Sequence, residues 1–381
     1  FNWLGMDKRD TIQPADFRKL GQALGMQFDT STAEALEEGL VPLSAKEGNR
    51  YLEIISRAKL RCITMDQEYN DKGDYTLHWS MLKRVNEVYA IYKSDLNKVD
   101  YTDMVQMFVD QGTAPTLDVL IVDEAQDLTP LQWKQVLLLK ENASRVWYAG
   151  DDDQCIHRWN GVDISSFMNA SKNKQILNQS YRVPRAVYHL ANKVVKRIGY
   201  RQHKDWKPRD EDGLVDFHMN WYDVNIDEGS WTIMARTNRS LNFIHNQLRD
   251  DGYLFERFGR PSLNPAYLQG MDTWSLLADG KQVSIGSLRE MYDLMPKQGE
   301  KALLKRGAKK TFDTVDPEGL YGYEELVAHH GLLASIDTRP ETVVNMSRED
   351  ITYVAAIRRR GEDLLKPRIA LSTIHRMKGG E

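Results

Sequence analysis

The spacing of apolar residues along the chain changes near residue 117. Before this point, apolar residues recur every three or four positions, as at Phe17, Leu20 and Leu24, and this spacing predicts amphipathic helices. After it, short runs with the texture of buried parallel strands alternate with helical segments. Strands are predicted at 119–122, 146–149, 175–177, 231–235 and 368–372. The pattern therefore predicts an α/β fold with parallel sheets, preceded by a mostly helical region.

Polar residues follow two of these predicted strands directly. Asp123 and Glu124 end the first strand, and an acidic loop that contains Gln154 ends the second. The carboxyl ends of parallel strands are where open α/β sheets place ligands. An acid pair there suits Mg²⁺ held largely through water, with the second carboxylate free to polarise a water. A bare Asp-Glu pair more often only starts a turn, so a site depends on its context.

Composition narrows the class of protein. The chain has 381 residues, which suggests two or three compact units, and its net charge of −4 excludes a histone-like basic binder. Cys62 and Cys155 are too few for a disulfide framework or a zinc cluster. A reducing setting fits this usage, and no apolar run is long enough to span a membrane. We expect a cytoplasmic protein, or one in the host-cell cytoplasm if its source is viral.

Two longer strings supply the missing context. Val-Asp-Glu-Ala-Gln-Asp (122–127) and Gly-Asp-Asp-Asp-Gln-Cys-Ile-His-Arg-Trp-Asn-Gly (150–161) resemble motifs II and III of superfamily 1 DNA helicases of the UvrD/PcrA/Rep type. The second string matches the family pattern at nine of twelve positions and departs at Cys155, His157 and Asn160. Four further segments resemble motifs of the family and occur in the family's order. One precedes the two strings, at 98–104, and three come after them, at 179–182, 235–238 and 372–381.

The resemblance implies ATP and Mg²⁺ as cofactors and assigns four catalytic residues. Asp123 would hold Mg²⁺, and Glu124 would orient the attacking water. Gln154 would reach the γ-phosphate or its water, although a Gln at this place can also cap a helix. Arg182 would clamp the γ-phosphate, because a guanidinium binds phosphate through a planar fork.

The nucleotide's base and sugar would meet two further residues. By the same resemblance, Tyr181 would stack against adenine and Glu381 would bond the ribose hydroxyls. A Tyr-Arg pair before Pro184 is also compatible with core packing and a surface charge.

A nucleic-acid site is implied around Trp159. Its polar neighbours do not suit a helix stripe, and flat aromatic faces stack on the bases of single strands. His157 stands where a second aromatic is usual, and Arg158 lies next to Trp159. Contacts with the phosphodiester backbone are implied for Arg236, Asn238, Thr373 and His375. A hydrogen-bonded loop histidine remains an alternative for His375.

Two parts of the family pattern are missing. No Gly-x-x-x-x-Gly-Lys-Ser/Thr string, whose backbone amides cradle phosphates, occurs in the sequence, and no motif VI follows motif V. We therefore expect an internal fragment of a longer helicase, inactive or slow toward ATP by itself.

The expected architecture is two RecA-like parallel-sheet domains, the first incomplete, with mostly helical insertions. We predict a mostly helical insertion of the first motor domain at 1–97 and part of that domain itself at 98–174. The second motor domain is predicted at 175–263 and again at 364–381, with a small accessory domain inserted at 264–363.

The expected function is that of an ATP-dependent DNA helicase and translocase. By resemblance, it would move 3′ to 5′ on single-stranded DNA and act at junctions of single- and double-stranded DNA. We expect a monomer without membrane contact. Two alternatives stay open: a non-catalytic nucleic-acid-binding module, and the motor subunit of a helicase–nuclease.

Overall fold

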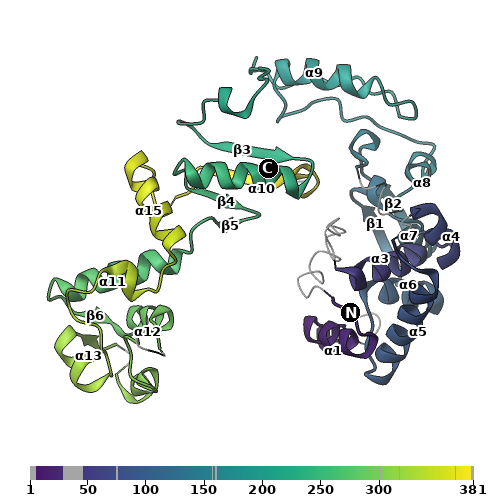
Figure 1. Cartoon of the computed structure of the whole chain (residues 1–381). Coiled ribbons are helices and arrows are strands. Elements are labelled where there is room, and N and C mark those ends of the chain that lie inside the picture. Colours follow the sequence, from purple (N-terminus) through teal and green to yellow (C-terminus); the bar gives the residue numbers. More distant parts are fainter. Residues whose placement is uncertain are drawn as a thin grey trace. The chain divides into compact units, whose positions relative to one another are not determined.

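The structure is a computed structural model, and it falls into two compact units (Figure 1). Unit 1 comprises residues 1–217 and unit 2 comprises residues 218–381. The described residues are 6–28, 46–73, 76–156, 158, 161–297, 299, 302–316, 318–364 and 366–378. The finer division predicted from the sequence stays a prediction.

Unit 1 begins with a helical layer. Its helices are α1 (Pro14–Leu24), α3 (Glu47–Leu60), α4 (Met65–Lys72), α5 (Trp79–Asp95) and α6 (Tyr101–Gln111). Phe17, Leu20 and Leu24 of α1 are all buried and share one core with Tyr51 of α3 and Leu82 of α5. The amphipathic helix predicted from the spacing of these residues is confirmed.

The second part of unit 1 is an α/β arrangement. It comprises β1 (Leu117–Val122), α7 (Pro130–Glu141), β2 (Ala143–Tyr148) and α8 (Ile164–Asn169). The two strands are parallel, with Val122 opposite Tyr148, so both strands end at the same edge. Helix α7 starts where expected because Pro130 occupies its first turn and the Thr129 hydroxyl accepts the Gln132 backbone N–H.

The last part of unit 1, residues 175–217, contains helix α9 (Arg185–Val195). The strand predicted at 175–177 is wrong. Leu177 is 86% exposed, and the pairing of this segment is limited to a single parallel bridge between Gln179 and Lys207. A short apolar run needs a neighbouring strand along its length to form a ladder, and among the described residues of unit 1 this run has none.

Unit 2 contains a four-stranded sheet of order β3-β8-β4-β5. Its strands are β3 (Trp231–Ala235), β4 (Phe255–Arg257), β5 (Arg260–Pro261) and β8 (Ile369–Thr373). Strand β8 is parallel to both β3 and β4. Helices α10 (Asn238–Asp250) and α15 (Arg348–Arg360) pack on this sheet through a core that includes Leu241, Leu248 and Ile357.

A second core lies in the same unit, beside the first. It is formed by α11 (Pro265–Ala278), β6 (Val283–Ser284), α12 (Ile285–Leu294), β7 (Leu320–Tyr321), α13 (Tyr323–His329) and α14 (Pro340–Val343). Helix α11 joins the two cores, because Met271 belongs to the sheet's core and Trp274 to the second one (Figure 1).

The observed elements confirm the predicted fold class, α/β with parallel sheets and helical insertions. The strands predicted at 231–235 and 368–372 are present as β3 and β8, and that at 119–122 lies within β1. Among the described helices, none combines the length and the apolar character that crossing a lipid bilayer requires.

Candidate functional site

The acid pair predicted from the sequence lies at the carboxyl end of β1. Both Asp123 and Glu124 are exposed, and Asp123 Oδ1 accepts the Glu124 backbone N–H at 2.8 Å. Glu124 has φ +49° and ψ +36°, in the left-handed region that residues other than glycine seldom adopt. Such a conformation persists only where its surroundings hold it, and it is concentrated at functional sites.

Gln126 is what holds this turn, and sequence reasoning missed it. Its side chain is 1% exposed. Gln126 Nε2 donates to Glu124 Oε2 at 2.5 Å, and Gln126 Oε1 accepts the backbone N–H of Asp151 at 3.0 Å. One buried amide therefore connects the acid pair after β1 to the acidic loop after β2.

The backbone places the two loops side by side. The Ala149 N–H donates to the Val122 carbonyl at 2.8 Å, and the Ala125 N–H donates to the Ala149 carbonyl at 3.0 Å. Gly150 follows, and a Cβ at this position would overlap the Gln126 carboxamide oxygen. Glycine is thus required here because the amide of Gln126 approaches so closely.

Gln154 extends from the second loop, at the end of a 3₁₀ helix, Asp152–Gln154. Its side chain is exposed, and Nε2 donates to Asp151 Oδ2 at 2.8 Å. Asp123, Glu124 and Gln154 thus project from the carboxyl ends of two adjacent parallel strands, as the sequence predicted for their elements.

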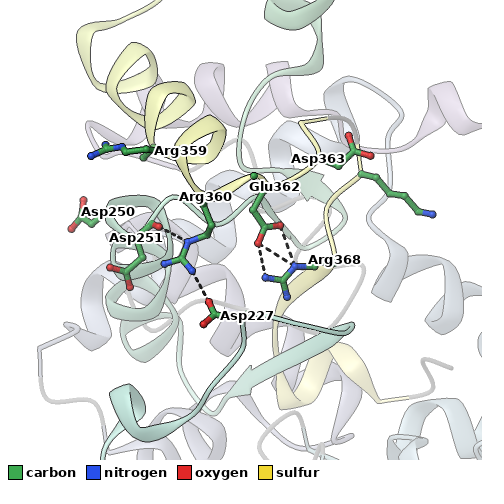
Figure 2. Close-up of a pocket in the computed structure, with 11 residues that line it drawn as sticks. Asp227, Asp250, Asp251, Arg359, Arg360, Glu362, Asp363 and Arg368 are labelled. Carbon is green, nitrogen blue, oxygen red and sulfur yellow. Dashed lines mark hydrogen bonds and ion pairs between the residues drawn. The ribbon is translucent and has the colours of Figure 1, made fainter.

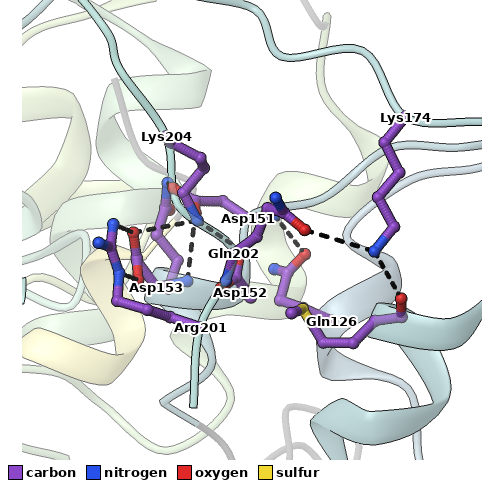
Figure 3. Close-up of polar contacts among 10 residues, drawn as sticks. Gln126, Asp151, Asp152, Asp153, Lys174, Arg201, Gln202 and Lys204 are labelled. Atoms are coloured by element: carbon purple, nitrogen blue, oxygen red, sulfur yellow. Dashed lines mark hydrogen bonds and ion pairs between the residues drawn. The ribbon is translucent and has the colours of Figure 1, made fainter. Parts of the chain in front are cut away.

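Two basic residues, Arg201 and Lys204, pair with the acidic loop (Figure 3). Arg201 and Lys204 form ion pairs with the three aspartates that precede Gln154. Burial alone would raise the pKa of Asp153, but hydrogen bonds from Arg201 and Lys204 outweigh it and lower that pKa below its ordinary value. Asp153 is therefore ionised and paired at neutral pH.

Tyr181 and Arg182 lie on an exposed turn before α9. The Tyr181 side chain is 84% exposed. Ser180 Oγ accepts the backbone N–H groups of Arg182 and Val183 at 3.4 and 3.2 Å. Within the described part of the chain, the Arg182 side chain forms no hydrogen bond or ion pair with Asp123, Glu124 or Gln154, so their meeting around one ligand stays a prediction.

Unit 2 gathers the four residues predicted to contact a nucleic-acid backbone. Ala235 pairs with Thr373 in the register of β3 and β8. Arg236 and Asn238 therefore follow one strand, and His375 follows its parallel neighbour, at the same edge of the sheet. Asn238 opens α10, and a helix N-terminus supplies backbone N–H groups suited to phosphate.

Three predicted site residues, His157, Trp159 and Glu381, lie outside the described residues. Arg158 is described and exposed, and its carbonyl accepts the Gly161 N–H at 3.1 Å. Gly161 has φ +88°, which favours glycine in this turn.

The residues after β1 fit the magnesium ion that the sequence predicts. In the described part of the chain, no group of three His, Cys, Asp or Glu side chains is arranged to enclose a metal. Mg²⁺ in phosphate-transfer sites keeps several waters and takes one or two carboxylates together with substrate phosphates. The exposed carboxylate of Asp123 suits that mode of binding.

A separate pocket of about 710 Å³ in unit 2 contains none of the predicted site residues (Figure 2). Its charged lining is largely paired within itself. Arg360 Nη1 lies 2.5 Å from Asp227 Oδ1, and Arg368 Nη2 lies 2.5 Å from Glu362 Oε1. Arg360 also lies 3.8 Å from the centre of the Tyr253 ring. These pairs connect the end of α15 and the residues just after it to segments that precede β3 and β8, which is a structural role.

Comparison with known proteins shows that the first part of the chain is similar to DNA helicases. The family model described as the UvrD/REP helicase N-terminal domain matches residues 6–175, which include Asp123, Glu124 and Gln154. The chain is also similar to proteins named ATP-dependent DNA helicase PcrA from Leuconostoc citreum (27% identity over 211 residues) and from Bacillus subtilis (28% over 165). A third relative is named Probable DNA helicase II homolog, from Mycoplasma capricolum (27% over 136).

These alignments cover part of each protein. They take in 48%, 39% and 31% of this chain for the Leuconostoc, Bacillus and Mycoplasma proteins. The corresponding shares of the relatives are 28%, 22% and 19%. The aligned part of the chain thus spans less than a third of each relative's length.

Proposed function

The chain is related to superfamily 1 helicases of the UvrD/PcrA type, and on this premise we propose that it forms the core of an ATP-dependent DNA translocase and helicase. The observation that carries the proposal is the strained turn at Glu124. Its carboxylate is held by buried Gln126, which also holds the loop of Gln154. A turn of this kind pre-organises a general base beside a metal-binding carboxylate.

The proposed reaction is hydrolysis of Mg-ATP. Mg²⁺ bound at Asp123 would neutralise part of the negative charge of the phosphates. Glu124 orients a water toward the γ-phosphorus and accepts its proton, while the bond from that phosphorus to the β–γ bridging oxygen breaks. Arg182 pairs with the phosphoryl oxygens, Tyr181 stacks on the adenine, and Glu381 bonds the ribose.

Gln154 is proposed to report the state of the γ-phosphate. Its amide here donates to the carboxylate of Asp151, a partner that it can exchange for a phosphate oxygen. Since Gln154 lies three residues before His157 and five before Trp159, a change at the phosphate reaches the proposed base-stacking residues directly.

The DNA contacts are proposed in two groups. Trp159 stacks on bases of a single strand, flanked by His157 and Arg158. The second group contacts the phosphodiester backbone and consists of Arg236, Asn238, Thr373 and His375. By family resemblance we propose 3′-to-5′ movement, action at single–double strand junctions, a monomeric state and a cytoplasmic location.

The phosphate cradle of the family is absent from this sequence. Backbone amides and a lysine of a Gly-x-x-x-x-Gly-Lys-Ser/Thr loop normally bind the β- and γ-phosphates, and the 381 residues contain no such string. We therefore propose that the 381-residue chain by itself releases phosphate from ATP slowly or not at all.

The test uses the product of the complete gene that encodes this chain. Phosphate release from Mg-ATP is measured with and without single-stranded DNA, in the wild type and in Glu124→Gln. We expect strong stimulation by DNA and a fall of 100-fold or more in the variant, because the amide accepts no proton. Glu141→Gln, at the exposed end of α7, is the matched control and should retain activity.

A non-catalytic nucleic-acid-binding module is the second candidate, favoured by the missing phosphate cradle. It predicts no DNA-stimulated phosphate release and DNA binding that weakens in Trp159→Ala. Full phosphate release by Glu124→Gln would contradict the assignment of Glu124 while leaving an ATPase in place.

A further inference from the structure

The loop that carries Gln154 has an unusual charge pattern. Three consecutive aspartates, Asp151, Asp152 and Asp153, directly precede Gln154. Neighbouring carboxylates repel one another, so a single conformation of this loop requires cations close by. Those cations come from residues about 50 positions further along the chain (Figure 3).

Lys204 meets all three carboxylates. Its Nζ lies 2.9 Å from Asp151 Oδ1 and 3.0 Å from Asp153 Oδ2. The same ammonium contacts Asp152, whose other carboxylate oxygen accepts the Gln202 backbone N–H at 2.7 Å. One lysine therefore contacts every carboxylate of the acidic run.

Arg201 adds a two-pronged contact. Its Nε and Nη2 donate to the two carboxylate oxygens of Asp153 at 2.7 and 2.6 Å. The side chains are withdrawn from solvent: Arg201 is 14% exposed, Lys204 16% and Asp153 10%. Charge-assisted contacts in such a setting are screened far less than surface ion pairs, and they fix geometry.

The same segment is hydrogen-bonded, only three residues later, to the turn of Tyr181 and Arg182. The Lys207 N–H donates to the Asn178 carbonyl at 2.7 Å, and the Ser180 N–H donates to the Lys207 carbonyl at 2.8 Å. The Arg209 N–H donates to the Val183 carbonyl at 2.9 Å. Residues 200–209, here called the coupling segment, thus contact two places that carry proposed ATP-site residues.

We propose that Lys204 and Arg201 are positioning residues, through which the coupling segment makes the Gln154 loop and the Arg182 turn shift together. Lys204 engages Oδ1 of Asp151, whose Oδ2 accepts the amide of Gln154. The lysine thereby fixes the position of the Asp151 carboxylate, from which the Gln154 amide separates when it binds a phosphate. The ATP step of this inference rests on the proposed function, whereas the mechanical connection rests on the contacts alone.

The mechanical part is tested on the 381-residue chain by amide hydrogen exchange. In Lys204→Met, we expect the amides of Ser180 and Lys207 to exchange at least tenfold faster. The side-chain contacts that this substitution removes are with residues 151–153, so faster exchange at Ser180 would show that the two places are connected. Lys193→Met, at an exposed position of α9, is the matched control and should leave them unchanged. Faster exchange confined to residues 151–155 would overturn the connection.

Swapping the charges of Arg201 and Asp153 distinguishes loss of their ion pair from a general loss of folding. Arg201→Asp and Asp153→Arg should each accelerate exchange at Ser180, and the double variant should recover at least half of the protection. Recovery requires the pairing itself, since the double variant has the same net charge as the wild type. Equal acceleration in the single and double variants would refute a specific role for this pair.

The ATP part is tested on the complete gene product. We expect Lys204→Met to lower DNA-stimulated kcat at least tenfold with KM for ATP changed less than threefold, and Lys204→Arg to retain most of the activity. Wild-type-like stimulation in Lys204→Met would overturn the inference alone. A wild type without DNA stimulation would instead overturn the proposed function, and the exchange data would still decide whether the segment couples the two sites.

Discussion

Replacing Gly150 by alanine tests whether Gln126 holds the two strand-end loops together. A Cβ at position 150 would overlap the Gln126 carboxamide oxygen and lie 3.0 Å from Phe167 Cζ. The carboxamide must move, because the new Cβ would lie closer to its oxygen than two non-bonded atoms can approach, and the Gln126 side chain is buried. Its movement breaks the hydrogen bond from the Asp151 N–H.

The expected cost follows from what the displaced amide leaves behind. A buried donor without an acceptor costs about 1–3 kcal/mol, and the Asp151 N–H is partly buried. The contact with Glu124 adds little, since that carboxylate is exposed and water replaces the amide. We expect Gly150→Ala to lower the free energy of unfolding of unit 1 by about 2 kcal/mol, which moves a urea midpoint by about 1 M.

The assay is urea unfolding of the 381-residue chain, combined with hydrogen exchange at Ala149, whose amide reports the junction of β1 and β2. A double-mutant cycle with Gln126→Ala isolates the mechanism. Without the Gln126 side chain only the milder contact with Phe167 remains, so Gly150→Ala should then cost less than about 0.5 kcal/mol. An equal loss in both backgrounds would refute the close contact as the cause.

Three further predictions concern stability in other parts of the chain. Burial alone would raise the pKa of Asp103, but Lys59 and Lys93 lower it to about 2 from 3.8. Asp103 therefore contributes about 2 kcal/mol to the free energy of unfolding above pH 4, and this contribution is lost as the pH falls toward 2. In urea unfolding, Asp103→Asn should be less stable than the wild type by this amount at pH 7 and not at pH 2. A loss of stability that is independent of pH would contradict the prediction. Leu326→Ala, at a fully buried position of the second core, should cost about 2–5 kcal/mol, with faster hydrogen exchange in α12 and α13; equal acceleration in β3 would contradict separate cores. Thr129→Ala removes the cap of α7 and should cost about 1 kcal/mol, measured by thermal unfolding against Thr129→Ser, which should retain most of the stability.

Strands and helices with strong local patterns were predictable from the sequence. The run before Asp123 and Glu124 is apolar and rich in β-branched residues, which favours the strand β1, and it pairs with β2. Helix α7 carries its own start signal in Thr129 and Pro130. The run at 175–177 lacks such support, because a strand requires a partner that no local pattern reveals, and the structure leaves it unpaired.

The candidate site was predictable in part. The order and spacing of the strings at 122–127 and 150–161 placed Asp123, Glu124 and Gln154 after two strands, and the parallel pairing of β1 and β2 puts both strand ends at one edge. Gln126 was missed although it lies within the first string. Its importance depends on the backbone N–H of Asp151, 25 residues away, and only the fold brings the two together.

The sequence by itself determined which residues carry charge, that the strongly apolar runs before the two acidic strings form strands, and that the acidic strings follow those strands. These properties depend on side-chain type and on neighbours a few positions away. The tertiary structure decided the left-handed conformation of Glu124, the need for glycine at Gly150, and the pairing of Lys204 with three aspartates about 50 residues earlier. By their charge alone, Arg201 and Lys204 indicate no more than a solvated face. Their role depends on a contact in space, which is set by how distant parts of the chain pack and not by the order of residues within it.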